Sequence, residues 1–431
     1  MRTMHIAVKV KDWLRAAMAV ALLATLAACG GGGGDSGSSS NSSSSPLNGG
    51  SLPLNPTQQP IAATAANTAP ITVGPGVKGV INIPTVSVTI CAPGSPTNCQ
   101  TINNIQLDTG SFGLRVVSSV LHSSLLNALP ISTLSSNGAQ LAECATFADG
   151  FTWGSVRTAT ITIGGETTTS SIALQMIGDK AASTVPSGGC GSGAEESTVS
   201  DLGANGILGV GTAPTDCGSL CLTTAISNYF ACPGGTSCTR TALAPAQQVA
   251  NPVANFPLDN NGVIVQMSPV SDTGQSSANG TLVFGIGTQS NNVLAASQTF
   301  PTDAFGNLNN SVFKGAPVQA FLDSGSNAYF FGDSSIALCG SNFPGFYCPS
   351  SAQTRSITLA GQNGTSSSVS IGILSAATLF ASGSNFAFND LAGQIGSNGS
   401  FDLGLPFFYG RHVYYGIDRT ATGGQSPFVG F

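Results

Sequence analysis

Two short segments of the chain carry an aspartate in the same setting. Asp108 follows an apolar stretch and precedes Thr109-Gly110-Ser111, and Asp323, 215 residues later, also follows an apolar stretch and precedes Ser324-Gly325-Ser326. An apolar strand that ends in such a turn delivers its carboxylate to a fixed place, because glycine permits close backbone approach and the small hydroxyl residues can hydrogen-bond the carboxylate. The repetition predicts two carboxylates that meet in one site.

A pair of carboxylates at close range has a definite chemistry. Two negative charges within a few ångström cannot both persist, so the pair shares one proton and its two apparent pKa values split. The charged member can act as general base on a water molecule, while the protonated member hydrogen-bonds a substrate carbonyl. This is a route for water to attack an amide without a metal, cofactor or covalent intermediate.

Each aspartate segment is followed by a second apolar motif, which indicates a duplicated lobe. Residues 205–211 read Asn-Gly-Ile-Leu-Gly-Val-Gly after the first, and residues 400–405 read Ser-Phe-Asp-Leu-Gly-Leu after the second. A single Asp-Thr-Gly-Ser string would be ordinary turn chemistry, and two unrelated Asx turns are the plain alternative. Two copies of the same pair of signals, in the same order, favour one site between two related halves.

The composition predicts an all-β protein. The chain has 431 residues with 55 Gly and 23 Pro, and apolar and polar residues alternate in runs such as 86–90 and 160–163. Sustained helical periodicity is limited to short stretches at 118–129 and 220–230. The formal net charge of −6 and the absence of Lys/Arg runs argue against nucleic acid as a partner.

The first residues resemble an export signal. Basic residues precede an apolar run at 16–24, and Leu26-Ala27-Ala28-Cys29 is similar to a bacterial lipobox, which implies cleavage before Cys29 and lipid attachment to its thiol. A plain signal peptide with an incidental cysteine is the alternative. Residues 1–28 are thus predicted as a signal peptide and 29–68 as a flexible Gly/Ser/Pro-rich tether that holds the protein to a membrane, by resemblance the outer membrane of a bacterial envelope.

The remaining ten cysteines form an even set, which in an exported chain predicts disulfides. Proximity favours Cys91–Cys99, Cys144–Cys190 and Cys339–Cys348. The other four cysteines allow three pairings, and a zinc site is the alternative reading; these are Cys217, Cys221, Cys232 and Cys238.

The two Asp-Thr/Ser-Gly-Ser segments resemble the catalytic loops of pepsin-like aspartic proteases. Residues 206–209 are similar to the segment that threads behind the first loop of that family, and residues 401–419 resemble its closing strands. The resemblance extends over residues 70–431 and also points to a divergent branch of exported bacterial proteins of unknown function. It implies a bilobal double-β-barrel fold, with an N-terminal lobe at 69–270 and a C-terminal lobe at 271–431.

The same resemblance implies roles for individual residues. Asp108 and Asp323 would be the catalytic dyad, Ser111 and Ser326 would bind the outer carboxylate oxygens, and Thr109 and Ser324 would join the two loops. A flap over substrate would be formed by Phe147, Asp149 and Gly150, with Trp153 beside it as a subsite wall or as plain packing.

Several positions depart from the family pattern. Phe147 stands where a tyrosine is usual, Gly113-Leu114-Arg115 replaces a stretch that usually contains an aromatic residue, and Leu405 replaces a frequent aspartate. The predicted function is a monomeric aspartic endopeptidase that cleaves peptide or protein substrates at acidic pH, with no metal or cofactor. The alternatives are a weak or inactive pepsin-fold surface protein that binds peptide or polysaccharide, and a purely structural surface protein.

Overall fold

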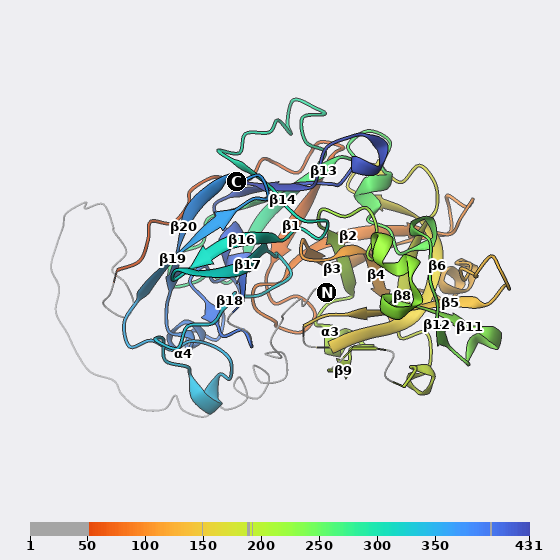
Figure 1. Ribbon diagram of the computed structural model, residues 1–431, viewed down its shortest axis with the longest axis horizontal. Coiled ribbons are helices and arrows are strands. Elements are labelled where there is room, and N and C mark those ends of the chain that lie inside the picture. The colour runs from red at the N-terminus through yellow and green to blue at the C-terminus, as the bar shows by residue number, and fades with distance from the viewer. Residues whose placement is uncertain (1–50, 149, 188–189, 192, 397–398) are drawn as a thin grey trace.

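The computed structural model describes residues 51–148, 150–187, 190–191, 193–396 and 399–431 (Figure 1). β-Strands dominate this part of the chain, and its α-helices are short: α2 (Ser123–Ala128), α3 (Val199–Leu202) and α4 (Ala376–Phe380). Helix α2 lies within the stretch predicted as helical at 118–129. The second predicted helix, at 220–230, is instead a series of 3₁₀ turns that leads into a strand at Tyr229. The prediction of an all-β, two-lobed fold with few short helices is confirmed.

The first half of the chain closes strands into a barrel. Its strands pair in a ring, each with the next and the last with the first, in the order β2 (Pro84–Cys91), β3 (Cys99–Asp108), β10 (Gly206–Val210), β4 (Phe112–Val117), β8 (Ile172–Ile177) and β6 (Gly150–Ile163). Alternation fills the interior: Val86, Val88 and Ile90 are buried, while Ser87 between them is exposed. Smaller strands extend this barrel, namely β5 (Gln140–Thr146), β7 (Glu166–Thr167), β9 (Ala194–Glu195), β11 (Tyr229–Cys232) and β12 (Thr239–Arg240).

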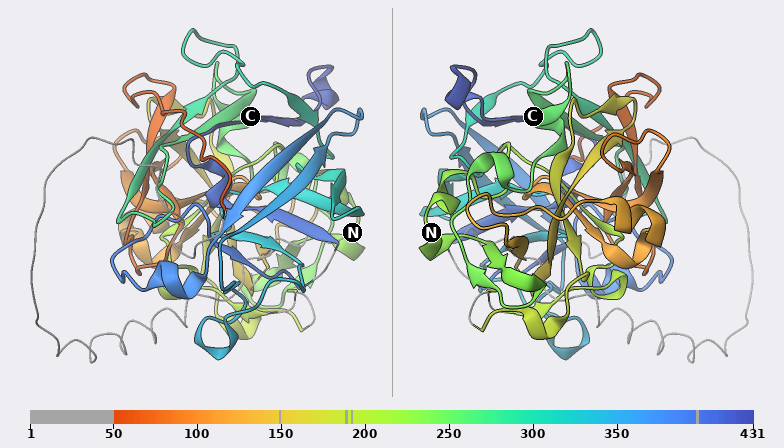
Figure 2. Two further views of the ribbon diagram at one scale, coloured as in Figure 1. Left: turned by 90° about the vertical axis from the view of Figure 1, so that its left-hand side faces the viewer. Right: turned by 90° about the vertical axis from the view of Figure 1, so that its right-hand side faces the viewer.

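The second half forms a separate seven-stranded sheet. Its strands lie in the order β20 (Ser366–Ile373), β19 (Gln353–Ala360), β16 (Leu308–Phe313), β17 (Ala316–Leu322), β22 (Ser400–Leu403), β18 (Tyr329–Phe331) and β21 (Ala392–Gly393). Figure 1 places the β19–β20 hairpin on the side opposite β6 and β8 of the first barrel, and the left view of Figure 2 shows this long hairpin in blue, facing the viewer. Stacked phenylalanines pack this half, and the Phe331 and Phe401 rings lie 4.7 Å apart.

An antiparallel platform connects the two halves (Figure 1). Its strands pair in the order β1 (Thr68–Val73), β14 (Ala278–Phe284), β13 (Gly262–Met267), β23 (His412–Gly416), β24 (Phe428–Gly430) and β15 (Thr299–Pro301). The platform therefore combines strands from both ends of the chain. The boundary placed between residues 270 and 271 stays a prediction; β13 and β14, on either side of it, pair with each other.

Disulfides close five loops of the described chain. The pairs Cys91–Cys99, Cys144–Cys190 and Cys339–Cys348 are confirmed. The four cysteines with an open pairing form Cys217–Cys221 and Cys232–Cys238, so the disulfide alternative holds over the zinc alternative. Across the described residues, no helix combines the length and apolar character needed to cross a membrane.

Candidate active site

The two aspartate segments occupy equivalent places in the two halves. β3 runs into Asp108 and lies parallel to β10, which also pairs antiparallel with β4. β17 leads to Asp323 in the same way, lying parallel to β22, which pairs antiparallel with β18. Each aspartate thus lies at the end of one strand. The neighbouring strand is the one formed by the second apolar motif of the same half. The duplicated arrangement predicted from the sequence is present in the structure.

Each carboxylate is held by its own turn. The Gly110 backbone N–H donates to Asp108 Oδ1 at 2.8 Å, and the Ser111 hydroxyl donates to Oδ2 at 2.5 Å. In the second turn, the residues that correspond to these, Gly325 and Ser326, donate to the two oxygens of Asp323 at 2.7 and 2.9 Å. Both aspartates are buried, with 7% and 4% of their surface exposed. Two donors per carboxyl group fix the orientation of each.

The two carboxyl groups face each other across the boundary between the halves. A methyl group placed on Gly110 would lie 2.5 Å from Cγ of Asp323, and one on Gly325 would lie 2.6 Å from Oδ1 of Asp108. Only glycine leaves room for the opposite carboxyl group at these two positions. Burial, followed by the charge of the hydrogen-bonded Asp108 carboxylate, raises the pKa of Asp323 well above its usual range. The raised pKa favours the protonated form of the Asp323 carboxyl group beside Asp108.

A reciprocal set of hydrogen bonds joins the two turns. The Thr109 hydroxyl donates to the Leu322 carbonyl and accepts from the Ser324 N–H, at 3.2 and 2.9 Å. The Ser324 hydroxyl donates to the Leu107 carbonyl and accepts from the Thr109 N–H, at 2.8 and 3.1 Å. The structure thus brings together all eight residues predicted for the dyad and its support.

Ser324→Ala should lower the free energy of unfolding by about 1–3 kcal/mol, because it leaves the Leu107 carbonyl and the Thr109 N–H buried without this partner. Urea unfolding measures the loss. Ser356→Ala is the matched control, since its hydroxyl pairs with Ser370 at an exposed position and its removal should cost less than about 0.5 kcal/mol. Equal losses in the two variants would mean that the bridge between the turns does not stabilise the fold.

The predicted flap is a hairpin between β5 and β6. Phe147 lies in its turn, where its N–H donates to the Gly150 carbonyl at 2.8 Å, and its half-buried ring packs on a cluster that includes Val117 and Ile207. Gly150 itself is buried beside β9. Asp149, also predicted for the flap, lies outside the described residues.

Trp153 lies in the core and not on a substrate wall. Its side chain has 0% exposure, its ring packs edge-on against Phe230 at 5.4 Å, and its Nε1–H donates to the Thr184 hydroxyl at 3.0 Å. The long strand β6 points Trp153 inward, between the barrel and β11. The prediction that Trp153 forms a subsite wall is therefore wrong. The alternative prediction, that Trp153 is a packing residue, agrees with its position.

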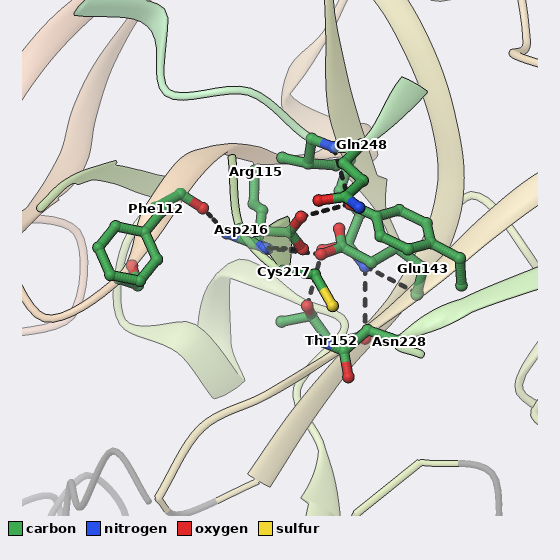
Figure 3. A network of polar contacts seen from close by, with 12 residues as sticks. Phe112, Arg115, Glu143, Thr152, Asp216, Cys217, Asn228 and Gln248 are labelled. Atoms are coloured by element: carbon green, nitrogen blue, oxygen red, sulfur yellow. Dashed lines mark hydrogen bonds and ion pairs between the residues drawn. The ribbon is translucent and has the colours of Figure 1, made fainter. Parts of the chain in front are cut away.

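Behind the first turn lies a buried ionic cluster that the sequence did not reveal (Figure 3). Arg115 contacts Glu143 at 2.6 Å and Asp216 at 3.2 Å, and it also donates to the Phe112 carbonyl at 2.8 Å. The Tyr229 hydroxyl donates to Asp216 at 2.5 Å. Burial and the charge of Glu143 raise the pKa of Asp216 well above its usual range, and Arg115 opposes that rise. The positive charge of Arg115 therefore offsets the free-energy cost of burying two carboxyl groups next to each other.

Two further residues adjoin the dyad. The Tyr415 hydroxyl donates to the Leu322 carbonyl at 2.9 Å, directly before Asp323. Asp402 on β22 is fully buried, and its pKa is raised well above the usual range by burial and then by the charge of Asp323. An alignment of the two apolar motifs in the sequence could have drawn attention to Asp402. In that alignment Asp402 of the second motif corresponds to Ile207 of the first, so an acid replaces an apolar residue. Tyr415 carries no such signal in the sequence.

No group of three or more His, Cys, Asp or Glu side chains among the described residues is arranged to hold a metal ion. The polar groups around the dyad come from its own two turns, from Gln106 of β3, which donates to the Gly325 carbonyl at 2.8 Å, and from β22 and β23. In this arrangement, the functional atoms of the site are two carboxyl groups and the hydroxyls that orient them.

Residues 63–431 match the model of a family described as "Protein of unknown function (DUF3443)". The chain belongs to this family. No curated protein matches it. Among solved structures, an aspartic proteinase from Irpex lacteus is similar, with 16% sequence identity and a TM-score of 0.46, over 84% of this chain and 96% of that one. The strand pairings described above give this DUF3443 protein the all-β, two-lobed fold class predicted from its sequence.

Proposed function

We propose that this DUF3443 protein is an aspartic endopeptidase that hydrolyses peptide bonds as a monomer. The observation that carries the proposal is the reciprocal seating of the two carboxyl groups, each against the glycine of the other's turn. Structural ion pairs combine opposite charges, whereas in this site six hydrogen-bonding and spacing residues hold two acids together. Such a pair is costly to bury unless it shares a proton, and a shared proton equips it for acid–base chemistry.

The raised pKa of Asp323 supports one assignment of roles within the pair. Asp323 holds the proton and would hydrogen-bond the carbonyl oxygen of the scissile amide, while Asp108 would remove a proton from the attacking water. The water oxygen bonds to the carbonyl carbon and the carbonyl oxygen takes the proton of Asp323, which gives a neutral gem-diol. Transfer of the proton on Asp108 to the amide nitrogen, with return of a diol proton to Asp323, breaks the C–N bond and regenerates the pair.

The purified protein incubated with a reduced, unfolded protein mixture between about pH 3 and pH 7 tests this proposal. Mass spectrometry should identify new peptide termini at acidic pH. Activity requires the shared proton, so it should decline as the pH rises through the point at which the pair loses that proton. A folded protein that produces no new termini at any of these pH values would contradict the proposal.

A second candidate function is capture of peptide without cleavage. Phe147 favours it, because this flap residue has no hydroxyl and its ring packs on the apolar cluster with Val117 and Ile207. A flap held in that way can cover a ligand without assisting the reaction. In the assay above, this candidate predicts intact peptides that bind the protein, with binding that persists in a variant without the dyad charges.

We also propose that the protein is attached to the bacterial envelope through lipid on Cys29. The lipobox-like segment and the Gly/Ser-rich stretch after it support this, although Cys29 lies outside the described residues. In cells, Cys29→Ser should move the protein from the membrane fraction to the soluble fraction, because a single lipidated residue supplies the attachment. Fractionation with immunoblotting measures it. An unchanged membrane fraction would exclude this anchor.

A further inference from the structure

One hydrogen bond between the two halves breaks the symmetry of the dyad turns. The Thr109 and Ser324 hydroxyls bridge the turns reciprocally. Gln106 adds a bond in one direction: its side-chain Nε2 donates to the Gly325 carbonyl at 2.8 Å. The equivalent position in the second half, 215 residues later, is Phe321, whose ring has no hydrogen to donate to a carbonyl. The amide of Gln106 therefore has no counterpart in the second half.

Gln106 lies on the strand face that carries Asp108. In β3, Ile105 and Leu107 are buried in the core, so Gln106 and Asp108, at the alternate positions, point to the opposite face. Gln106 is half-buried, whereas only 7% of the surface of Asp108 is exposed. The Gln106 side chain thus leaves the strand on the side of Asp108 and reaches across to Gly325 of the other half.

Gly325 contacts both carboxyl groups of the dyad. Its N–H donates to Asp323 Oδ1 at 2.7 Å, and a methyl group on its Cα would lie 2.6 Å from Asp108 Oδ1. Glycine has no side chain whose packing could fix its peptide groups, so a bond to its carbonyl restricts their rotation. Rotation at Gly325 would alter the bond to Asp323 and the spacing to Asp108 together. Gln106 therefore holds a residue that sets the geometry of the pair.

The first half also holds the far end of the second turn. The buried Asn82 donates from Nδ2 to the Asn327 carbonyl at 2.8 Å. In the first turn, the equivalent carbonyl belongs to Phe112 and accepts from Arg115 of its own half at 2.8 Å. The first half thus supplies hydrogen bonds to both turns, and Gln106 supplies the one to the glycine that adjoins both acids.

We propose that Gln106 is a positioning residue of the dyad: through the Gly325 carbonyl its amide holds the second turn against Asp108, and this sets how strongly the two acids share a proton. Acids that share a proton must stay at close range, and functional groups of this kind are held to within about 0.5 Å by their supporting residues. The effect of Gln106 on peptide cleavage rests on the proposed function, whereas its effect on the titration of the pair does not.

Gln106→Met tests the bond, because methionine has a similar length and no donor. It should lower kcat for peptide cleavage by about 10–100-fold and change KM by less than about twofold, since it displaces a catalytic carboxyl group and leaves substrate contacts in place. In carboxyl ¹³C titrations, the two apparent pKa values of the pair should move closer together by about 0.5–1 pH unit. Gln100→Met is the matched control: Gln100 is half-buried on the same strand, and its Nε2 donates to the Val120 carbonyl at 2.8 Å. This control should alter neither readout.

Gln106→Glu should restore the bond in acid alone. Below about pH 4 its carboxyl group is protonated and can donate to the Gly325 carbonyl, whereas the ionised group can only accept. The activity of Gln106→Glu should therefore equal that of the wild type at about pH 3 and fall at least about tenfold below it by about pH 6. A residue with a merely structural role would not give this pH-dependent rescue.

The remaining outcomes overturn the proposal. If Gln106→Met cleaves peptide as the wild type does and its pair titrates unchanged, the bond to Gly325 does not position the dyad, although the protease function stands. If Gln100→Met changes both readouts to the same extent, the cause is a general weakening of β3. Should the protein cleave no peptide, the titration decides by itself: a smaller separation in Gln106→Met supports the positioning role, and an unchanged one contradicts it.

Discussion

Asp108→Asn and Asp323→Asn should each lower kcat/KM for peptide cleavage by at least about 10³-fold. Asparagine nearly preserves the shape of aspartate, and its Oδ1 can still accept the hydrogen bond from Gly110 or Gly325. It can neither take a proton from water nor give one to the substrate. Because the two members act as one unit, the double variant should be only slightly less active than either single variant.

The same substitutions should leave stability unchanged or increase it. The pKa of Asp323 is raised in the folded protein, so its contribution to the free energy of unfolding is present at low pH and is lost as the pH rises. Asp323→Asn removes that loss, and the gain should be largest near pH 7. Urea unfolding at about pH 4 and pH 7 measures it. Asp201→Asn, on an exposed site of α3, is the control: asparagine can still accept hydrogen bonds from the Thr198 N–H and hydroxyl, so activity should be unaltered and any loss of stability should be small and similar at both pH values.

An inactive variant that is as stable as the wild type distinguishes a chemical role from a folding role. If both dyad variants instead retained full activity, the cleavage would arise elsewhere. If they lost activity together with the fold, the hydrogen bonds to the carboxylates would be structural in the first place.

Arg115→Met should lower the free energy of unfolding by about 3–5 kcal/mol near pH 7. Methionine fills much of the volume but leaves Glu143 and Asp216 buried without the guanidinium that contacts both of them (Figure 3). The pKa of Asp216 is already raised and should rise further in the variant. Its folded form then binds a proton that the unfolded chain releases, so the destabilisation should be smaller at about pH 4 than at pH 7.

Two comparisons isolate the buried charges in this variant. Lys314→Met removes a half-exposed partner of Asp333 and should cost less than about 1 kcal/mol. Adding Glu143→Gln and Asp216→Asn to Arg115→Met should restore part of the lost stability, because no unpaired charge remains. A loss from Arg115→Met below about 1 kcal/mol at pH 7 would show that solvent or local rearrangement satisfies the two carboxylates.

Much of the site was predictable because it is built from local repeats. Asp108 and Asp323 each carry their hydrogen-bond donors within the next three residues, so the sequence itself specifies the turn. The second apolar motif of each half then identifies the strand that pairs in parallel with the strand leading to the aspartate. The disulfides with short separations follow for the same reason: few competing partners lie nearby along the chain.

The parts that failed or were missed depend on long-range contacts. Trp153 lies in the part of β6 that is buried on both faces. Apolar and polar residues do not alternate there, so the sequence pattern could not show that the Trp153 ring is fully buried. In the sequence Arg115 looks like an ordinary charged residue. Its role depends on contacts with Glu143 and Asp216, which are distant in the sequence and adjacent only in the fold. Asp402 is informative only against Ile207, and that comparison requires the register of two separate parallel strand pairs.

The central claim is that Asp108 and Asp323 form one site that shares a proton. Carboxyl ¹³C chemical shifts of labelled aspartates, followed from about pH 2 to pH 8 in the wild type and the two Asn variants, test this without a substrate. The account predicts two coupled steps for the pair, the second well above the usual aspartate range of about 4, and a return toward a single step in either variant. Two independent titrations near the usual value, unchanged when the other aspartate is replaced, would contradict it.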